Sequence, residues 1–280
     1  MAVTTHGILI GYDGSPGSER ALQWAVREAR RRGSVLTVCH VCAPGGLPAP
    51  PGGAAATGHM EESALPHLAG GLRYAREVMG PERTRPLLAT GLAALVLCQL
   101  SADADMVVVG SRGRDGLPGS LLGPVSQQVC AYAHGRVVVV RGHWHEAAGY
   151  APGPVVVGAD GSAASRAAIA FAVEEAVLGE VPLLAVCALA DSPGSLGGAR
   201  PMQETFDRDM TWWAKQYPEL TILRRITPGQ PRAALLEAAA EAQLLVVGNR
   251  GRGGLQGMPL GSVGQAMLHH APCPVGVARV

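Results

Sequence analysis

The chain repeats itself, and this duplication restricts its fold more than any other feature. Residues 8–15 (ILIGYDGS) return as residues 155–162 (VVVGADGS), 147 positions further on. Residues 106–114 return as residues 244–252 after 138 positions, and the apolar runs near the end of each half keep that second offset. A repeat of this kind indicates two homologous modules. We therefore predict an N-terminal domain over residues 1–142 and a C-terminal domain over residues 153–280, with a linker between them.

Within each half, short β-branched runs alternate with segments of helical length. In the first half we expect strands at 7–13, 34–42, 84–90, 105–110 and 136–141, and helices at 17–32, 60–79, 92–102 and 124–134. In the second half we expect strands at 154–160, 181–188, 220–227, 244–248 and 274–279. The apolar runs are nearly continuous, which is typical of parallel strands covered on both faces. The predicted fold class is α/β: two tandem open parallel-sheet modules, Rossmann-like, each with five strands and about four helices.

Composition excludes several classes of function. The formal net charge is +1 and aromatic residues make up 4%, so the chain lacks the basic surface and the stacking platforms of nucleic-acid-binding proteins. We expect neither a nucleic acid nor a membrane as partner. The phosphate-binding P-loop requires a Gly-Lys-Ser/Thr step. The single lysine, Lys215, follows Ala214, so the sequence excludes a P-loop ATPase.

Cysteine use and hydropathy bear on the compartment. The N-terminus leads directly into an apolar strand without a signal-peptide pattern, and no apolar run approaches 18 residues. We expect a cytoplasmic protein whose six cysteines are reduced. Residues 39–42 (CHVC) invite a redox or metal interpretation, but alternate strand positions point to opposite faces and a second cysteine pair is missing. The histidines at 143, 145, 269 and 270 are interpreted as structural.

The repeated loops are candidates for binding phosphate. In an open parallel sheet the ligand crevice lies at the carboxyl ends of the strands, where the strand order reverses. If the first and fourth strands flank that point, both repeated loops reach the same crevice. In the C-terminal half the second loop carries Gly248 and Gly251, then nine residues, then Gly261 and Ser262. Glycines let backbone N–H groups approach phosphate oxygens, and we expect Ser262 to cap the helix that follows.

Charged side chains accompany this loop. Arg250 and Arg252 add fixed positive charge. Asp160, at the end of the first strand of the module, can accept hydrogen bonds from a ribose or help to hold Mg²⁺. The same three residues also allow a plain interpretation, because Asp-Gly is a common turn pair and exposed arginines are often only solvated.

These motifs together resemble the universal stress proteins, and specifically the tandem-domain, ATP-binding type. The pattern is Gly-x2-Gly-x9-Gly-Ser after a strand ending Val-Val-Gly, with the opening Asp-Gly-Ser, and it spans residues 7–141 and 154–279. Residues 229–231 (GQP), 91–93 (GLA) and 270–275 (HAPCPV) match further family motifs. The resemblance implies an adenine nucleotide alpha hydrolase-like fold, an ATP ligand that can carry Mg²⁺, and pairing of modules or of two chains through their last strands.

The resemblance also implies a set of nucleotide-binding residues. In the C-terminal half they are Gly158, Asp160, Ala188, Gly248, Arg250, Gly251, Arg252, Gly261, Ser262 and Val263. In the N-terminal half they are Gly11, Asp13, Val41, Gly110, Arg112, Gly113, Gly123 and Val125. Either Asp13 or Asp160 is a candidate ligand of a metal ion, Mg²⁺. No catalytic residue is implied.

The N-terminal half departs from the pattern at one position. Pro124 stands where the motif requires serine or threonine. Proline is compatible with the first turn of a helix, but it lacks the N–H group and the hydroxyl. We therefore expect the N-terminal site to bind more weakly than the C-terminal site.

The leading hypothesis is an ATP-binding protein of stress response or signalling, in which the nucleotide alters conformation or assembly. One alternative is an interaction scaffold that needs no nucleotide, and Ala188 and Pro124 keep that alternative open. Another is a slow ATPase, although the sequence shows no local nucleophile–base pair or kinase-type catalytic loop.

Overall fold

The computed structural model describes residues 6–42, 66–113, 121–141, 153–189, 196–253 and 258–280. The linker expected at residues 142–153 lies outside the described residues, except for residue 153. Residues 60–65 of the helix expected at 60–79 also lie outside them. The chain divides into two compact units, residues 1–140 and residues 141–280. Each unit contains one copy of the repeated sequence and is described by itself.

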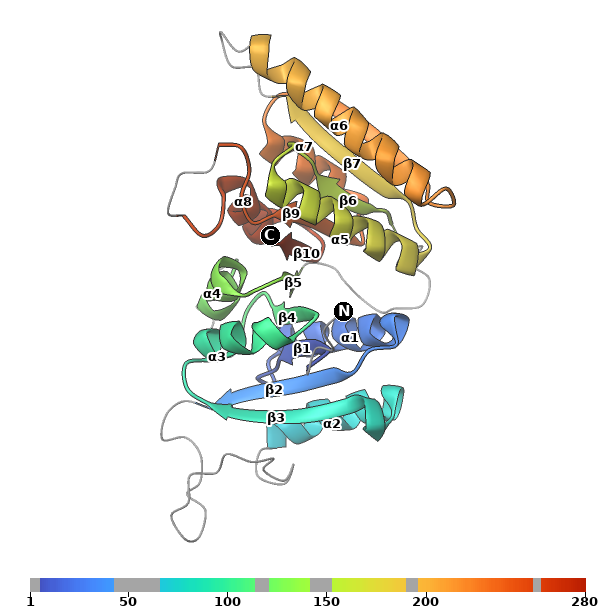
Figure 1. The fold of residues 1–280 in the computed structure, drawn as a ribbon. Helices are drawn as coiled ribbons and strands as arrows, with labels where there is room; N and C mark the ends of the chain where they lie inside the picture. Colours follow the sequence, from blue (N-terminus) through green and yellow to red (C-terminus); the bar gives the residue numbers. More distant parts are fainter. Residues whose placement is uncertain (1–5, 43–65, 114–120, 142–152, 190–195, 254–257) are drawn as a thin grey trace. The chain divides into compact units, whose positions relative to one another are not determined.

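The N-terminal unit is an open parallel sheet of five strands in the order β3-β2-β1-β4-β5 (Figure 1). The strands are β1 (Ile8–Gly11), β2 (Leu36–Cys42), β3 (Thr84–Thr90), β4 (Met106–Gly110) and β5 (Arg136–Val140). The helices are α1 (Pro16–Arg32), α2 (Pro66–Met79), α3 (Ala93–Leu100) and α4 (Pro124–Tyr132). Helices α1 and α2 pack together, as do α3 and α4, on the two faces of the sheet.

The C-terminal unit repeats this arrangement with the strand order β8-β7-β6-β9-β10. Its strands are β6 (Val155–Gly158), β7 (Leu183–Leu189), β8 (Ile222–Pro228), β9 (Leu244–Gly248) and β10 (Val275–Ala278). Its helices are α5 (Ala163–Gly179), α6 (Leu196–Gln216), α7 (Pro231–Ala238) and α8 (Ser262–His270). The predicted fold class, two tandem five-stranded parallel modules with four helices each, is confirmed.

Helix α1 shows how local sequence sets these boundaries. Ser15 is the N-cap and accepts a hydrogen bond from the Ser18 N–H group, and Pro16 occupies the first helical position. The helix ends at Gly33, which adopts the left-handed conformation that glycine tolerates best (φ 62°).

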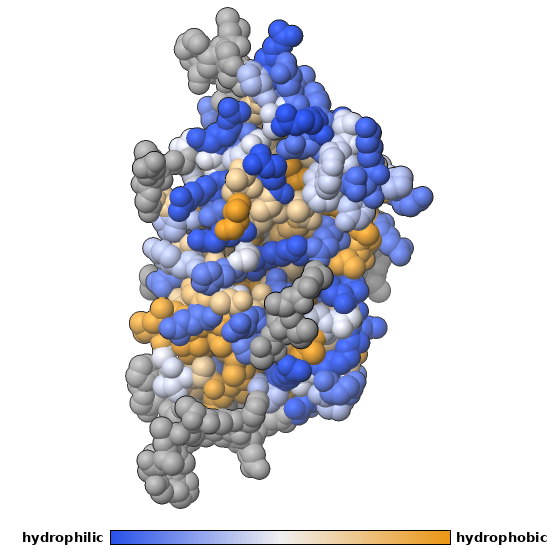
Figure 2. Space-filling view, in the orientation of Figure 1, coloured by the Kyte–Doolittle hydropathy of each residue, from blue (hydrophilic) through white to orange (hydrophobic). Residues whose placement is uncertain are grey.

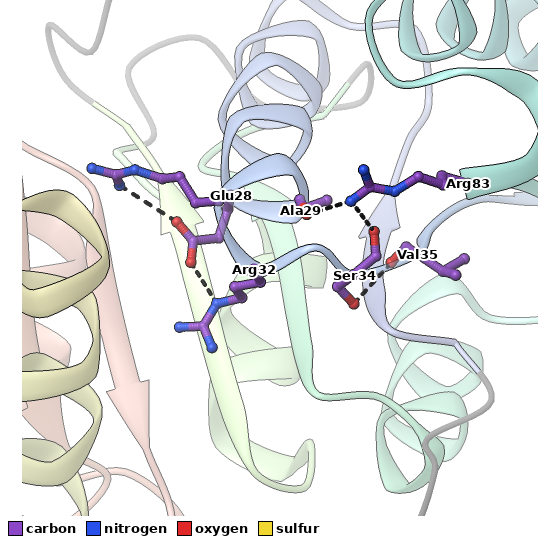
Figure 3. Close-up of polar contacts among 7 residues, drawn as sticks. Glu28, Ala29, Arg32, Ser34, Val35 and Arg83 are labelled. Carbon is purple, nitrogen blue, oxygen red and sulfur yellow. Dashed lines mark hydrogen bonds and ion pairs between the residues drawn. The ribbon is translucent and has the colours of Figure 1, made fainter.

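Charged side chains stabilise the C-terminal end of α1. The carboxylate of the buried Glu28 forms ion pairs with Arg31 and Arg32 in the last turn of the helix. Figure 3 shows the pair with Arg32. From the other side, Arg83 donates to backbone carbonyls at the end of α1 and just after it. Cationic groups at this position interact favourably with the negative end of the helix dipole.

The face shown in Figure 2 is mostly hydrophilic, with an apolar area over α3 and the adjoining end of β3. Leu92 and Leu95 are the most exposed large apolar side chains there, at 69% and 56%. None of the helices among the described residues has both the length and the apolar character needed to cross a membrane.

Candidate functional site

The two repeated loops of the C-terminal unit meet at one cavity. Strand β6 pairs with β7 on one side and with β9 on the other, so the strand order reverses between β6 and β9. The carboxyl ends of these strands border a cavity of about 630 Å³, a size typical of small-molecule sites. The lining includes all ten residues that the sequence singles out in this half: Gly158, Asp160, Ala188, Gly248, Arg250, Gly251, Arg252, Gly261, Ser262 and Val263.

Other lining residues were not predicted as site residues, although Gln230 belongs to the motif at residues 229–231. They come from the ends of strands and from helices that the chain folds against the loops. The apolar ones include Val186, Leu189, Met202, Leu235 and Met258, and Gln230 and Gln265 add polar groups. The cavity therefore has a glycine-rich side formed by backbone and an apolar side formed by side chains. Of these seven residues, only Val186 and Leu235 have N-terminal counterparts, Cys39 and Leu97, that also line a cavity.

The first glycine of the loop allows two backbones to approach closely. A Cβ atom on Gly248, the last residue of β9, would lie 2.7 Å from the carbonyl carbon of Ala164 in the first turn of α5. In the N-terminal unit a Cβ atom on Gly110 would lie 2.5 Å from the carbonyl carbon of Gly17. Real Cβ atoms do not come that close to backbone, so a side chain at either position would displace the strand from the helix.

The start of α8 corrects one sequence prediction. Gly261, not Ser262, is the N-cap, and no side chain caps the helix; Ser262 is the first helical residue. The N–H group of Gly261 donates to the carbonyl of Asn249 at 2.8 Å, which joins the end of the long loop to its beginning. The expectation that Ser262 caps the helix was therefore wrong by one residue. The N–H groups of the first helical turn have no intrahelical acceptor, and the residues that carry them line the cavity.

Asp160 follows β6 and accepts hydrogen bonds at both carboxylate oxygens. Its Oδ1 atom accepts from the Ser162 N–H group at 3.0 Å. Its Oδ2 atom accepts from the Arg252 N–H group at 2.9 Å, although 92 positions separate the two residues in the chain. The carboxylate thus connects the loop after the first strand of the module to the loop after the fourth.

The N-terminal unit has an equivalent but smaller cavity, of about 160 Å³. Its lining includes all eight residues that the sequence singles out in this half: Gly11, Asp13, Val41, Gly110, Arg112, Gly113, Gly123 and Val125. Pro124 occupies the first helical position of α4, as expected. The cavity is smaller than the sites that usually hold a nucleotide-sized molecule.

Three pairs of equivalent positions help to explain the difference in volume. The N-terminal cavity has the larger residue at each of them: Val41, Pro124 and Ser126 stand where the C-terminal cavity has Ala188, Ser262 and Gly264. The Ser126 hydroxyl donates to the carbonyl of Gly110 at 2.6 Å, which orients this side chain toward the end of β4.

The two cysteines of the segment 39–42 are buried residues of a strand. Cys39 and Cys42 lie in β2, and all six cysteines are free. Burial raises the pKa of Cys39 and of Cys273 to about 12, and burial with the nearby carboxylates of Asp160 and Asp207 raises the pKa of Cys187 to about 11. At pH 8 only on the order of a thousandth of the Cys187 side chains are thiolate. The redox interpretation of residues 39–42 therefore has no chemical support.

We expect these three thiols to react with a disulfide reagent much more slowly in the folded protein than in urea. Because folding keeps them neutral, their contribution to the free energy of unfolding is present below about pH 8.5 and is lost as the pH rises through about 11 to 12. Labelling at pH 8 followed by mass spectrometry of peptides measures the first effect, and urea unfolding between pH 8 and pH 11 measures the second. Fast labelling of Cys39 in the native protein would show that its thiol is not protected by burial.

Comparison with known proteins agrees with the duplicated fold and loops. The sequence profile of the universal stress protein family matches residues 5–141 and again residues 153–279. A universal stress protein of Mycolicibacterium smegmatis is 35% identical over 100% of this chain and 99% of its own length. One from Mycobacterium tuberculosis is 34% identical over 98% of this chain and 96% of its own.

Solved structures support the fold. A universal stress protein from Archaeoglobus fulgidus superposes with a TM-score of 0.67 at 19% identity and covers 100% of this chain and 99% of that one. A structure from Pseudomonas aeruginosa, described as a putative universal stress protein, gives 0.67 at 16% identity over 100% and 95%. The profile matches both halves and the relatives align end to end, so the chain belongs to the universal stress protein family.

Proposed function

We propose that this protein binds ATP in the C-terminal cavity and that the bound nucleotide alters its conformation or assembly in a stress response or signalling role. The observation that carries the proposal is the cavity of about 630 Å³ between a glycine loop, the start of α8 and an apolar wall. Such a cavity offers one side to phosphate and the other to a base, which is what a nucleotide requires.

The phosphate side is the loop after β9 together with the first turn of α8. Helix N-termini attract anions through their unpaired N–H groups and the helix dipole. Arg250 and Arg252 line the same side and remain charged at any physiological pH. This side supplies backbone donors and positive charge without a P-loop lysine, consistent with the position of Lys215 at the end of α6.

The base side consists of side chains from β7, α6 and α7. Val186, Leu189, Met202 and Leu235 present apolar surface to the cavity, and Gln230 lies at the start of α7 with both a donor and an acceptor in its side chain. An uncharged ring fits against such a wall because its flat faces lose water on binding.

The difference between the two cavities predicts one bound nucleotide per chain. The N-terminal cavity has about a quarter of the volume, and Pro124 at the first helical position of α4 lacks the N–H group that Ser262 provides at the start of α8.

The family membership of both halves, with domains over residues 1–142 and 153–280, also supports assembly of two chains through the last strands. Light scattering with and without ATP tests this assembly.

Calorimetric titration of the full chain with ATP tests the proposal. We expect binding at micromolar concentrations with a stoichiometry close to one per chain. Incubation with labelled ATP, followed by measurement of ADP, separates binding from hydrolysis. Absence of any heat and of any retained label at these concentrations would leave the nucleotide-independent scaffold as the better hypothesis.

A further inference from the structure

This inference concerns what Asp160 does, and it rests on the proposed nucleotide site. An aspartate at the tip of a strand beside a phosphate-binding loop is an obvious candidate for a ribose or Mg²⁺ ligand. In this structure both of its carboxylate oxygens accept backbone N–H groups, from Ser162 at 3.0 Å and from Arg252 at 2.9 Å. Hydrogen bonds from backbone N–H groups to a carboxylate are among the stronger ones in proteins.

The second glycine of the loop faces this carboxylate. A Cβ atom built on Gly251 would lie 2.5 Å from Oδ2 of Asp160, and the next nearest atom, at 3.7 Å, also belongs to Asp160. Gly251 does not have a positive φ, so its backbone conformation does not itself require glycine. The residue type is therefore set by the space that the Asp160 carboxylate occupies.

The N-terminal unit repeats this geometry independently. A Cβ atom on Gly113 would lie 2.6 Å from Oδ2 of Asp13, and the Ser15 N–H group donates to Oδ1 of Asp13 at 2.9 Å. The contact is kept although the N-terminal cavity is small and has lost the serine of the motif. The contact between aspartate and glycine thus does not depend on the serine of the motif or on a large cavity.

The residues around Asp160 do not by themselves form a cage for Mg²⁺. No group of three or more metal-binding side chains occurs among the described residues. Each oxygen of Asp160 accepts one backbone N–H group, which fixes the carboxylate against the loop. The expectation that Asp13 or Asp160 binds Mg²⁺ stays a prediction.

We propose that Asp160 is a positioning residue: it holds Gly251 and Arg252 of the loop in place at the cavity, and Gly251 is glycine in order to admit the carboxylate. Asp160 then acts on the nucleotide through the loop. Loss of the carboxylate then releases the loop, whereas a side chain at residue 251 forces the carboxylate and the loop apart.

A double-mutant cycle tests this arrangement through ATP affinity. We expect Gly251→Ala to weaken binding roughly tenfold or more in the wild-type background and by less than about threefold in the Asp160→Ala background, because the clash is then gone. The dependence of ATP affinity on Mg²⁺ should be the same in wild type and Asp160→Ala. Equal effects of Gly251→Ala in both backgrounds, or a lost Mg²⁺ dependence in Asp160→Ala, would overturn the proposal.

A second measurement needs no nucleotide and separates this proposal from the proposed function. In the nucleotide-free protein we expect the Arg252 amide to exchange its hydrogen faster in Asp160→Ala than in wild type, with Asp160→Asn between them. Glu237→Ala is the matched control, since Glu237 lies on α7 outside the cavity lining and forms an ion pair with the exposed Arg225. Unchanged exchange at Arg252 in Asp160→Ala refutes the positioning role even if ATP binds as expected.

Discussion

Replacement of Ser262 by proline is expected to lower the affinity of the chain for ATP by roughly tenfold to a thousandfold. Ser262 is the first residue of α8, a position where proline fits the helical backbone. The substitution therefore removes one N–H donor and one hydroxyl without breaking the helix. A hydrogen bond to a charged group contributes about 1.5–3 kcal/mol, and one or two such bonds are lost. Calorimetric titration measures the affinity, and a thermal melt shows whether the fold is kept.

The natural N-terminal sequence provides the control for this experiment. Pro124 occupies the first position of α4, so Pro124→Ser makes the reverse change in the other unit. We expect it to leave the affinity of the C-terminal site unchanged. If Ser262→Pro kept the wild-type melting temperature and bound ATP within about twofold of wild type, the phosphates would not lie at the start of α8.

Enlarging the N-terminal cavity is expected to raise the stoichiometry from one nucleotide per chain to two. The variant combines Val41→Ala, Pro124→Ser and Ser126→Gly, which copies into this unit the residues that line the larger cavity. The changes remove side-chain volume and restore one N–H donor and one hydroxyl. Glycine at residue 126 costs about 1 kcal/mol of helix stability, so the melting temperature should fall slightly.

The same triple change in a Ser262→Pro background isolates the new site. There the N-terminal unit should account for most of the heat of ATP binding. A stoichiometry that stays at one in the triple variant, with the fold intact, would mean that the three residues do not limit access. The cause would then have to be sought at the other lining residues, such as Tyr12 or Leu97.

The repeat made the fold predictable. The same alternation of strands and helices occurs in both halves. Comparing the halves indicates β1 (Ile8–Gly11) and its equivalent β6 (Val155–Gly158) with only small errors at the ends. Helix ends were harder. The expected helix at 92–102 is α3 followed by a separate 3₁₀ turn at Ser101–Asp103, because the final residues form i to i+3 hydrogen bonds.

The motif residues of the candidate site could be predicted because they lie in short motifs of fixed spacing. Met202 and Leu235 could not, since they reach the cavity only through the packing of α6 and α7 against the sheet. The role of Ser262 was misjudged by one residue because both glycine and serine are good N-caps, so sequence alone does not decide between Gly261 and its neighbour. Likewise, the Asp160–Arg252 hydrogen bond joins residues too far apart for any local pattern to indicate.

Under the proposed function, the unequal volumes of the two cavities have a consequence for how such a chain responds to the energy charge of a cell. A duplicated protein with two equal sites can respond sigmoidally to its ligand, because occupancy of one half can influence the other. With only one half able to load, the saturation curve of a single chain is hyperbolic and its response to falling ATP is gradual. Any steep threshold must then arise from contacts between chains, and it would vary with protein concentration.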